Sequence, residues 1–152
     1  MKTSQKGIDL IKSFEGWYAA PYRDPIGIAT IGYGFTYYPG TRRKVTMQDP
    51  SLTKQQGEQM LREVLMTYEN DVLRLVRAEL NQNQFDALVS FTFNLGGGSL
   101  AKSTLLKKIN KNPCDPTIRA EFEKWRLAGG KVLAGLVRRR KAEADLYFSS
   151  EK

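Results

Sequence analysis

The chain has 152 residues, of which 41% are hydrophobic and 26% charged, a composition typical of one soluble globular domain that excludes an intrinsically disordered protein. Histidine is absent and Cys114 is the only cysteine, which excludes internal disulfides and histidine-based nucleophilic catalysis and leaves acid–base chemistry to carboxylates. The net charge is +8, and residues 102–152 supply most of it, with thirteen basic and six acidic side chains. This field favours association with polyanions, whether nucleic acid, acidic lipid or an anionic cell wall.

The first predicted helix begins after Thr3 or Ser4, either of which can cap it, and ends before Gly16. Glu15 falls in its last turn, where a negative charge faces the unfavourable end of the helix dipole, so helix stability does not explain the residue. No apolar run in this segment is longer than two residues, so it predicts neither a signal peptide nor a membrane span. We therefore expect the chain to stay in the cytoplasm unless something releases it.

Residues 22–45 lose the helical period and predict a small antiparallel sheet, because prolines and glycines divide short β-prone runs. Asp24 lies in a turn before Pro25. In the run from residue 28, strict alternation places Thr30, Gly32 and Gly34 on one face, which is then almost bare of side chains. A bare face lets a ligand approach the backbone, and we expect it to form the floor of a cleft.

Two capping boxes open the next two predicted helices, because Thr53 and Asn81 are each followed three residues later by glutamine. The first helix reaches to about residue 78, long enough to bridge two lobes. The second is the most apolar, ends at the glycines 96–98, and is the candidate core of the larger lobe.

Three shorter helices complete the prediction. Ser103 caps one, and Asp115 caps another with Pro116 in its first position. The last runs from about residue 135 to 148 with Leu136, Val137, Ala144 and Tyr147 as its apolar face, against the basic run 138–141. The expected fold is α+β in a single domain, with a β-rich lobe at about 15–55 and a helical lobe formed by 1–14 and 56–152.

Glu15, Asp24 and Thr30 form the candidate catalytic constellation. Each has an ordinary structural explanation by itself: a solvated acid at a helix end, a turn former before proline, and a β-branched residue in a strand. A helix end, a turn and a strand can nevertheless converge on one cleft, since polar groups concentrate at the ends of elements and in loops. Two carboxylates and a hydroxyl then suit acid–base hydrolysis.

The order of motifs along nearly the whole chain resembles the phage-type (T-even) lysozymes, and most of all their endolysin branch. The motifs are the three residues of the constellation, TIGYG at 30–34, FNLGGG at 93–98, a tryptophan at 125, AGG, GL and an arginine pair at 138–139. The resemblance implies a lysozyme-like fold. It also implies hydrolysis of the β-1,4 bond between N-acetylmuramic acid and N-acetylglucosamine in peptidoglycan, with inversion.

The resemblance also assigns roles: Glu15 as general acid, Asp24 as second carboxylate, and Thr30 as the hydroxyl that helps hold the attacking water. It implies a monomer without cofactor or metal that depends on a separate holin and makes no stable membrane insertion. The expected substrate-binding residues are Gly32, Gly34, Asn94, Arg138 and Arg139, with one of the two arginines near the acid.

The chain departs from the family pattern in two places, and three other functions compete with this interpretation. Phe35 stands where many relatives have histidine, and the loop at 37–53 is longer than in the smallest relatives. The basic C-terminal third also fits a nucleic-acid-binding domain, although no recognisable motif supports it. The two remaining competitors are a wall-binding protein without catalysis and a transglycosylase that uses a single glutamate.

Overall fold

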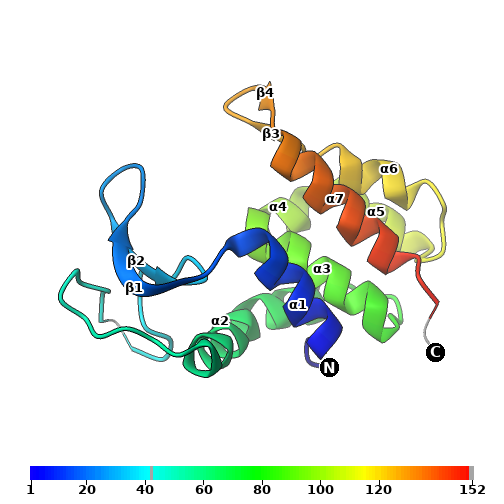
Figure 1. Cartoon of the computed structure of the whole chain (residues 1–152). Helices are drawn as coiled ribbons and strands as arrows, with labels where there is room; N and C mark the ends of the chain where they lie inside the picture. Colours follow the sequence, from blue (N-terminus) through cyan, green and yellow to red (C-terminus); the bar gives the residue numbers. More distant parts are fainter. Residues whose placement is uncertain (42, 151–152) are drawn as a thin grey trace.

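The computed structural model describes residues 1–41 and 43–150 and has the predicted α+β fold, a helical body with two small antiparallel hairpins (Figure 1). One hairpin and the loop after it lie to one side of the helices (Figure 1). The division into two lobes at about residues 15 and 55 stays a prediction. The helices are α1 (Gln5–Glu15), α2 (Lys54–Leu75), α3 (Gln82–Leu95), α4 (Gly97–Lys102), α5 (Thr104–Lys111), α6 (Ile118–Glu123) and α7 (Ala134–Tyr147), and the strands are β1 (Tyr18–Arg23), β2 (Ala29–Gly32), β3 (Leu127–Ala128) and β4 (Lys131–Val132).

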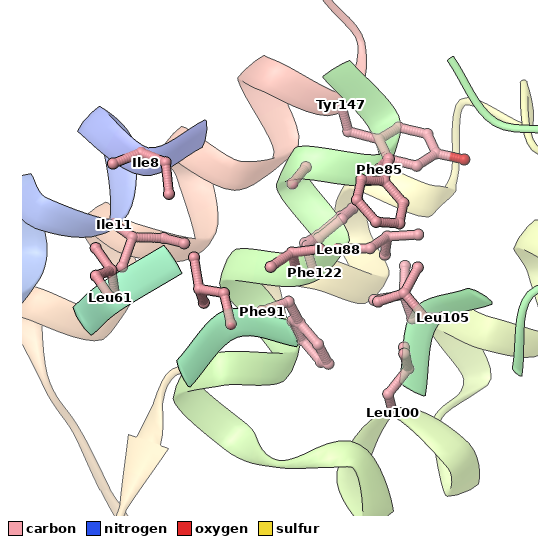
Figure 2. Close-up of a cluster of buried hydrophobic side chains, with 14 of the residues drawn as sticks. Ile8, Ile11, Leu61, Phe85, Leu88, Phe91, Leu100, Leu105, Phe122 and Tyr147 are labelled. Atoms are coloured by element: carbon pink, nitrogen blue, oxygen red, sulfur yellow. The ribbon is translucent and has the colours of Figure 1, made fainter. Parts of the chain in front are cut away.

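Helix α3 is the centre of the core, as its apolar sequence predicts. Ten consecutive residues, 83–92, are buried, and α1, α2, α4 and α7 all pack against this helix. Figure 2 shows its side chains Phe85, Leu88 and Phe91 among residues from several other helices. Because four helices pack against this largely buried helix, it sets their positions relative to one another. The C-terminal ends of α1 and α3 and the N-terminal half of α7 carry four of the predicted site residues, and the first hairpin carries the others.

Local capping chemistry is confirmed at α2, α3 and α5. Thr53 and Asn81 both form complete capping boxes, and Ser103 Oγ accepts a hydrogen bond from the Leu106 amide at 3.0 Å. The predicted side-chain cap of α1 is wrong. Ser4 precedes that helix, but its hydroxyl and its amide both donate to the buried Asp86 carboxylate of α3, because a buried carboxylate needs donors more than a surface helix end does.

Several predicted boundaries shift. Helix α2 ends at Leu75, three residues before the predicted end, and Gly97 begins the short helix α4 where a glycine stop was expected. Gly96 alone ends α3, with φ 92°. Helix α6 begins only at Ile118, because Asp115 forms a local turn in which its carboxylate accepts from the Thr117 amide at 2.9 Å.

The first hairpin corrects the expected glycine face. Strand β2 ends at Gly32, and the chain turns back so that Ile31 and Phe35 exchange two backbone hydrogen bonds of 2.9 Å. Gly32 and Gly34 have φ of 67° and 88°, which interrupts the alternation. A Cβ on Gly32 would lie 2.9 Å from the buried Phe35 ring, whereas Gly34 is exposed with no neighbour within 4 Å of such an atom. The bare face assumed from strict alternation therefore does not exist.

No sequence pattern predicted the second hairpin. Leu127 pairs with Val132 across a turn at Gly129 and Gly130, whose φ values are 57° and 78°. Both strands are exposed, and Figure 1 shows them beside the start of α7. The two glycines close a tight turn here rather than simply ending a helix.

Candidate active site

Glu15 is the last residue of α1, and Gly16 follows it with φ 67°. Its side chain is 19% exposed and lines a hollow of about 450 Å³ between the C-terminal ends of α1 and α3 and the start of α7. Three other predicted site residues line the same hollow: Asn94 from α3, and Arg138 and Arg139 from α7. The tertiary structure thus brings together residues that are up to 124 positions apart in the chain.

Arg139, rather than Arg138, contacts the glutamate. Its Nη1 lies 3.5 Å from Glu15 Oε1, and its side chain is only 4% exposed. The guanidinium also lies 5.6 Å from the centre of the Phe14 ring. Arg138 is exposed at the mouth of the hollow. The buried Arg139 therefore holds Glu15 in place from the protein interior, and the exposed Arg138 can contact a ligand from the solvent side.

Asp24 and Thr30 lie on the β1–β2 hairpin and are coupled through the backbone of Ile28. The Ile28 amide donates to Asp24 Oδ1 at 2.9 Å, and its carbonyl accepts from Thr30 Oγ1 at 2.9 Å. The amide of Ile26 donates to the same Asp24 oxygen at 3.0 Å. Since the Thr30 proton is committed to Ile28, its hydroxyl oxygen can serve only as an acceptor, for example from a water molecule.

Neither Asp24 nor Thr30 lines the hollow around Glu15, but Tyr22 interacts electrostatically with both carboxylates. Burial raises the pKa of the Tyr22 phenol, and Tyr18, Asp24 and Glu15 raise it further through their charges. Tyr22 is paired with Thr30 across the hairpin. The hairpin therefore presents a phenol within electrostatic reach of the two carboxylates that the sequence singled out.

A family model described as phage lysozyme matches residues 12–143, which includes every predicted site residue. The chain belongs to the phage lysozyme family.

The chain is similar to proteins from several phages and one bacterium. It is 40% identical over 151 residues to an endolysin of Bacillus phage PZA, covering 98% of this chain but only 56% of that protein. The endolysin from Escherichia coli O157:H7 phage FAHEc1 is 36% identical with a TM-score of 0.88, covering 97% of this chain and 94% of the other. The muramidase domain of SpmX from Asticaccaulis excentricus is 34% identical with a TM-score of 0.82, covering 98% and 99%.

Two buried charges, Arg140 and Glu143, were not anticipated as part of the site. The basic run on α7 was expected to lie opposite an apolar face that includes Val137, yet Arg139 and Arg140 are buried and Val137 is 40% exposed. Arg140 Nη2 donates to Asn94 Oδ1 at 2.9 Å. Glu143, one turn later, is fully buried beside both arginines. A spacing of three or four residues was the only sequence signal that could have revealed this cluster.

Within the described ranges 1–41 and 43–150, no group of three or more histidine, cysteine, aspartate or glutamate side chains is arranged to hold a metal ion. Among the helices described, none combines the length and the apolar character needed to cross a lipid bilayer.

Proposed function

We propose that this phage lysozyme is a muramidase that hydrolyses the β-1,4 bond between N-acetylmuramic acid and N-acetylglucosamine in bacterial peptidoglycan during host lysis. The observation that carries the proposal is Glu15, a carboxyl group at a helix end that opens into a hollow and is backed by the buried Arg139. The match to the phage lysozyme family and the likeness to a muramidase domain support it.

In the proposed reaction the two carboxyl groups have opposite roles. Protonated Glu15 donates its proton to the leaving glycosidic oxygen, and Asp24 accepts a proton from a water that attacks the anomeric carbon from the opposite face. The Thr30 hydroxyl oxygen accepts the other hydrogen of that water, which orients it. A single displacement of this kind inverts the anomeric configuration and needs a separation of about 6.5–9.5 Å between the carboxyl groups.

Substrate contacts follow from the exposed polar groups around Glu15. Arg138 at the mouth of the hollow and Asn94 at its side are the proposed contacts, together with Gly34 and the Gly32 backbone on the hairpin. The positive charge of residues 102–152 is proposed to attract the enzyme to the anionic wall. The reaction requires no cofactor or metal.

The proposal extends to how the enzyme acts in the host: as a monomer, stored in the cytoplasm and released by a separate holin. The resemblance to endolysins supports this route. Expression in a Gram-negative host should leave cell density unchanged until a pore-forming protein is co-expressed or chloroform is added. Lysis from expression alone would contradict the dependence on a holin.

The decisive test is clearing of chloroform-treated Gram-negative cells by the wild type and by Glu15→Gln, with product anomers followed by NMR. The amide keeps the shape of the side chain but has no acidic proton, so we expect clearing to fall by about 10²–10⁴-fold with the fold preserved. Glu63→Gln, an exposed glutamate on α2, is the matched control and should clear normally.

The wall-binding and transglycosylase alternatives each predict a different result. A wall-binding protein sediments with purified sacculi without clearing them, and a transglycosylase yields products without a free reducing end. Retention rather than inversion of the first product anomer would overturn the roles of Asp24 and Thr30. Near-normal clearing by Glu15→Gln would overturn the catalytic assignment as a whole.

A further inference from the structure

Glu143 is a fully buried carboxylate that the proposed reaction does not use directly. Ser90 Oγ from α3 donates to its Oε2 at 2.5 Å. Arg140 Nε lies 2.8 Å from its Oε1, and Arg139 Nε lies 3.4 Å from its Oε2. One carboxylate thus compensates two buried guanidinium groups on its own helix. Burying these charges costs free energy, which only close pairing and further hydrogen bonds can offset.

Each of the two arginines contacts Glu143 and also one residue that lines the hollow. Arg139 reaches Glu15 with Nη1, at 3.5 Å from Oε1. Arg140 reaches Asn94, where its Nη2 donates to Oδ1 at 2.9 Å. The C-terminal ends of α1 and α3 are therefore both connected to one carboxylate on α7.

We propose that Glu143 is a positioning residue for the active site, acting through Arg139 on Glu15 and through Arg140 on Asn94. This inference rests on the proposed function, since it assumes that Glu15 is the general acid. It adds a residue that touches no substrate but determines how two that do are presented.

The first arm concerns charge. If Glu15 were the only anionic partner of Arg139, the arginine would favour the ionised form of Glu15. A general acid must instead carry its proton when the glycosidic oxygen leaves. Glu143 supplies a negative charge to the same guanidinium, so Arg139 can hold Glu15 in place with much of its own charge already compensated. Arg138 on α7 lines the same hollow, and Tyr22 on β1 interacts electrostatically with Glu15.

The second arm concerns orientation. Asn94 lines the hollow and uses its Oδ1 to accept from Arg140, so its Nδ2 is the polar atom left to meet a ligand. The substrate group that it recognises must then be an acceptor, such as a hydroxyl oxygen or the carbonyl oxygen of an N-acetyl group. Arg140 is itself fully buried against the Phe91 ring, 5.2 Å from its centre, and cannot turn away to release the amide.

Because Glu143, Arg139 and Arg140 are all buried, each of these charges depends on the others for compensation. Burial raises the pKa of Glu143 and lowers that of Arg140, and each charge offsets the effect on the other. Removal of the carboxylate leaves two adjacent guanidinium groups without their shared counter-charge. Arg139 then keeps Glu15 as its only anionic contact, beside the neutral oxygens of Ser90, and Arg140 keeps Asn94, so both contacts should strengthen.

The test is Glu143→Gln in the full chain, with kcat and KM measured on peptidoglycan fragments across a range of pH. We expect the alkaline limb of the activity profile to move to lower pH by about one unit, so that activity on that limb falls about tenfold. Asp145→Asn is the matched control, because Asp145 lies on the same helix with its side chain 51% exposed and should leave the profile unchanged. Glu143→Asp, which keeps the charge, should restore the wild-type limb.

A second variant tests the other arm independently and remains decisive if Glu143→Gln does not fold. Asn94→Asp keeps a partner for Arg140 but replaces the amide donor with an acceptor, so KM should rise severalfold with little change in kcat. A folded Glu143→Gln with the wild-type profile, or an Asn94→Asp with the wild-type KM, overturns the corresponding arm. If the wild type itself fails to clear peptidoglycan, or Glu15→Gln clears normally, the proposed function fails instead.

Discussion

Gly57, in the first turns of α2, has no room for a side chain because Trp17 covers it. A Cβ at this position would lie 2.2 Å from Cζ3 and 2.6 Å from Cη2 of the Trp17 ring. That ring also packs against Tyr33, with 4.9 Å between the ring centres, and Tyr33 is itself buried. The indole is rigid, so it must shift as a unit to admit a methyl group.

We therefore expect Gly57→Ala to destabilise the protein despite the better helix propensity of alanine. The propensity difference favours alanine by about 1 kcal/mol, whereas inserting a methyl group into a packed site costs about 1–3 kcal/mol. The net loss is then about 0–2 kcal/mol. At about 2–4 °C per kcal/mol for a chain of this length, Tm should fall by up to about 8 °C.

Thermal unfolding followed by circular dichroism measures this effect. Gly98→Ala is the matched control, since Gly98 lies in helix α4, is exposed, and has no heavy atom within 4 Å of an added Cβ. The control should keep or raise Tm. If Gly57→Ala raises Tm as much as the control does, the close approach of Trp17 to α2 is wrong and propensity alone decides the outcome.

Two further predictions concern the loop after the first hairpin and the start of α2. Hydrogen bonds from Tyr38 and Thr46 lower the pKa of Asp49 from 3.8 to about 2, so this carboxylate stabilises the fold above about pH 4, and its contribution is lost as pH falls toward 2. The difference in Tm between wild type and Asp49→Asn should accordingly be largest near neutral pH and close toward pH 2; a gap independent of pH would contradict this. Thr53→Ala removes the α2 capping box and should cost about 1 kcal/mol in denaturant unfolding. Thr67→Ala, on an exposed position of the same helix, should cost nothing, and an equal loss in both variants would exclude the cap as the cause.

Features that depend on a few neighbouring residues followed from the sequence. The boxes at Thr53 and Asn81 form because donor and acceptor lie only three residues apart, and Gly16 ends α1 directly after Glu15. The burial of α3 followed from its apolar composition, and family motifs were sufficient to identify the α+β lysozyme-like fold. These predictions needed no knowledge of how the helices pack.

The tertiary structure alone decided which charges enter the site. Successive residues of a helix point about 100° apart, so the run at 138–141 contains both exposed and buried side chains, and only packing against α3 determines that Arg139 and Arg140 turn inward. The same packing buries Glu143 and brings Arg139 to Glu15 across 124 positions of sequence. No local pattern records such a contact, because the free energy that fixes it comes from burying the faces of α1, α3 and α7 together.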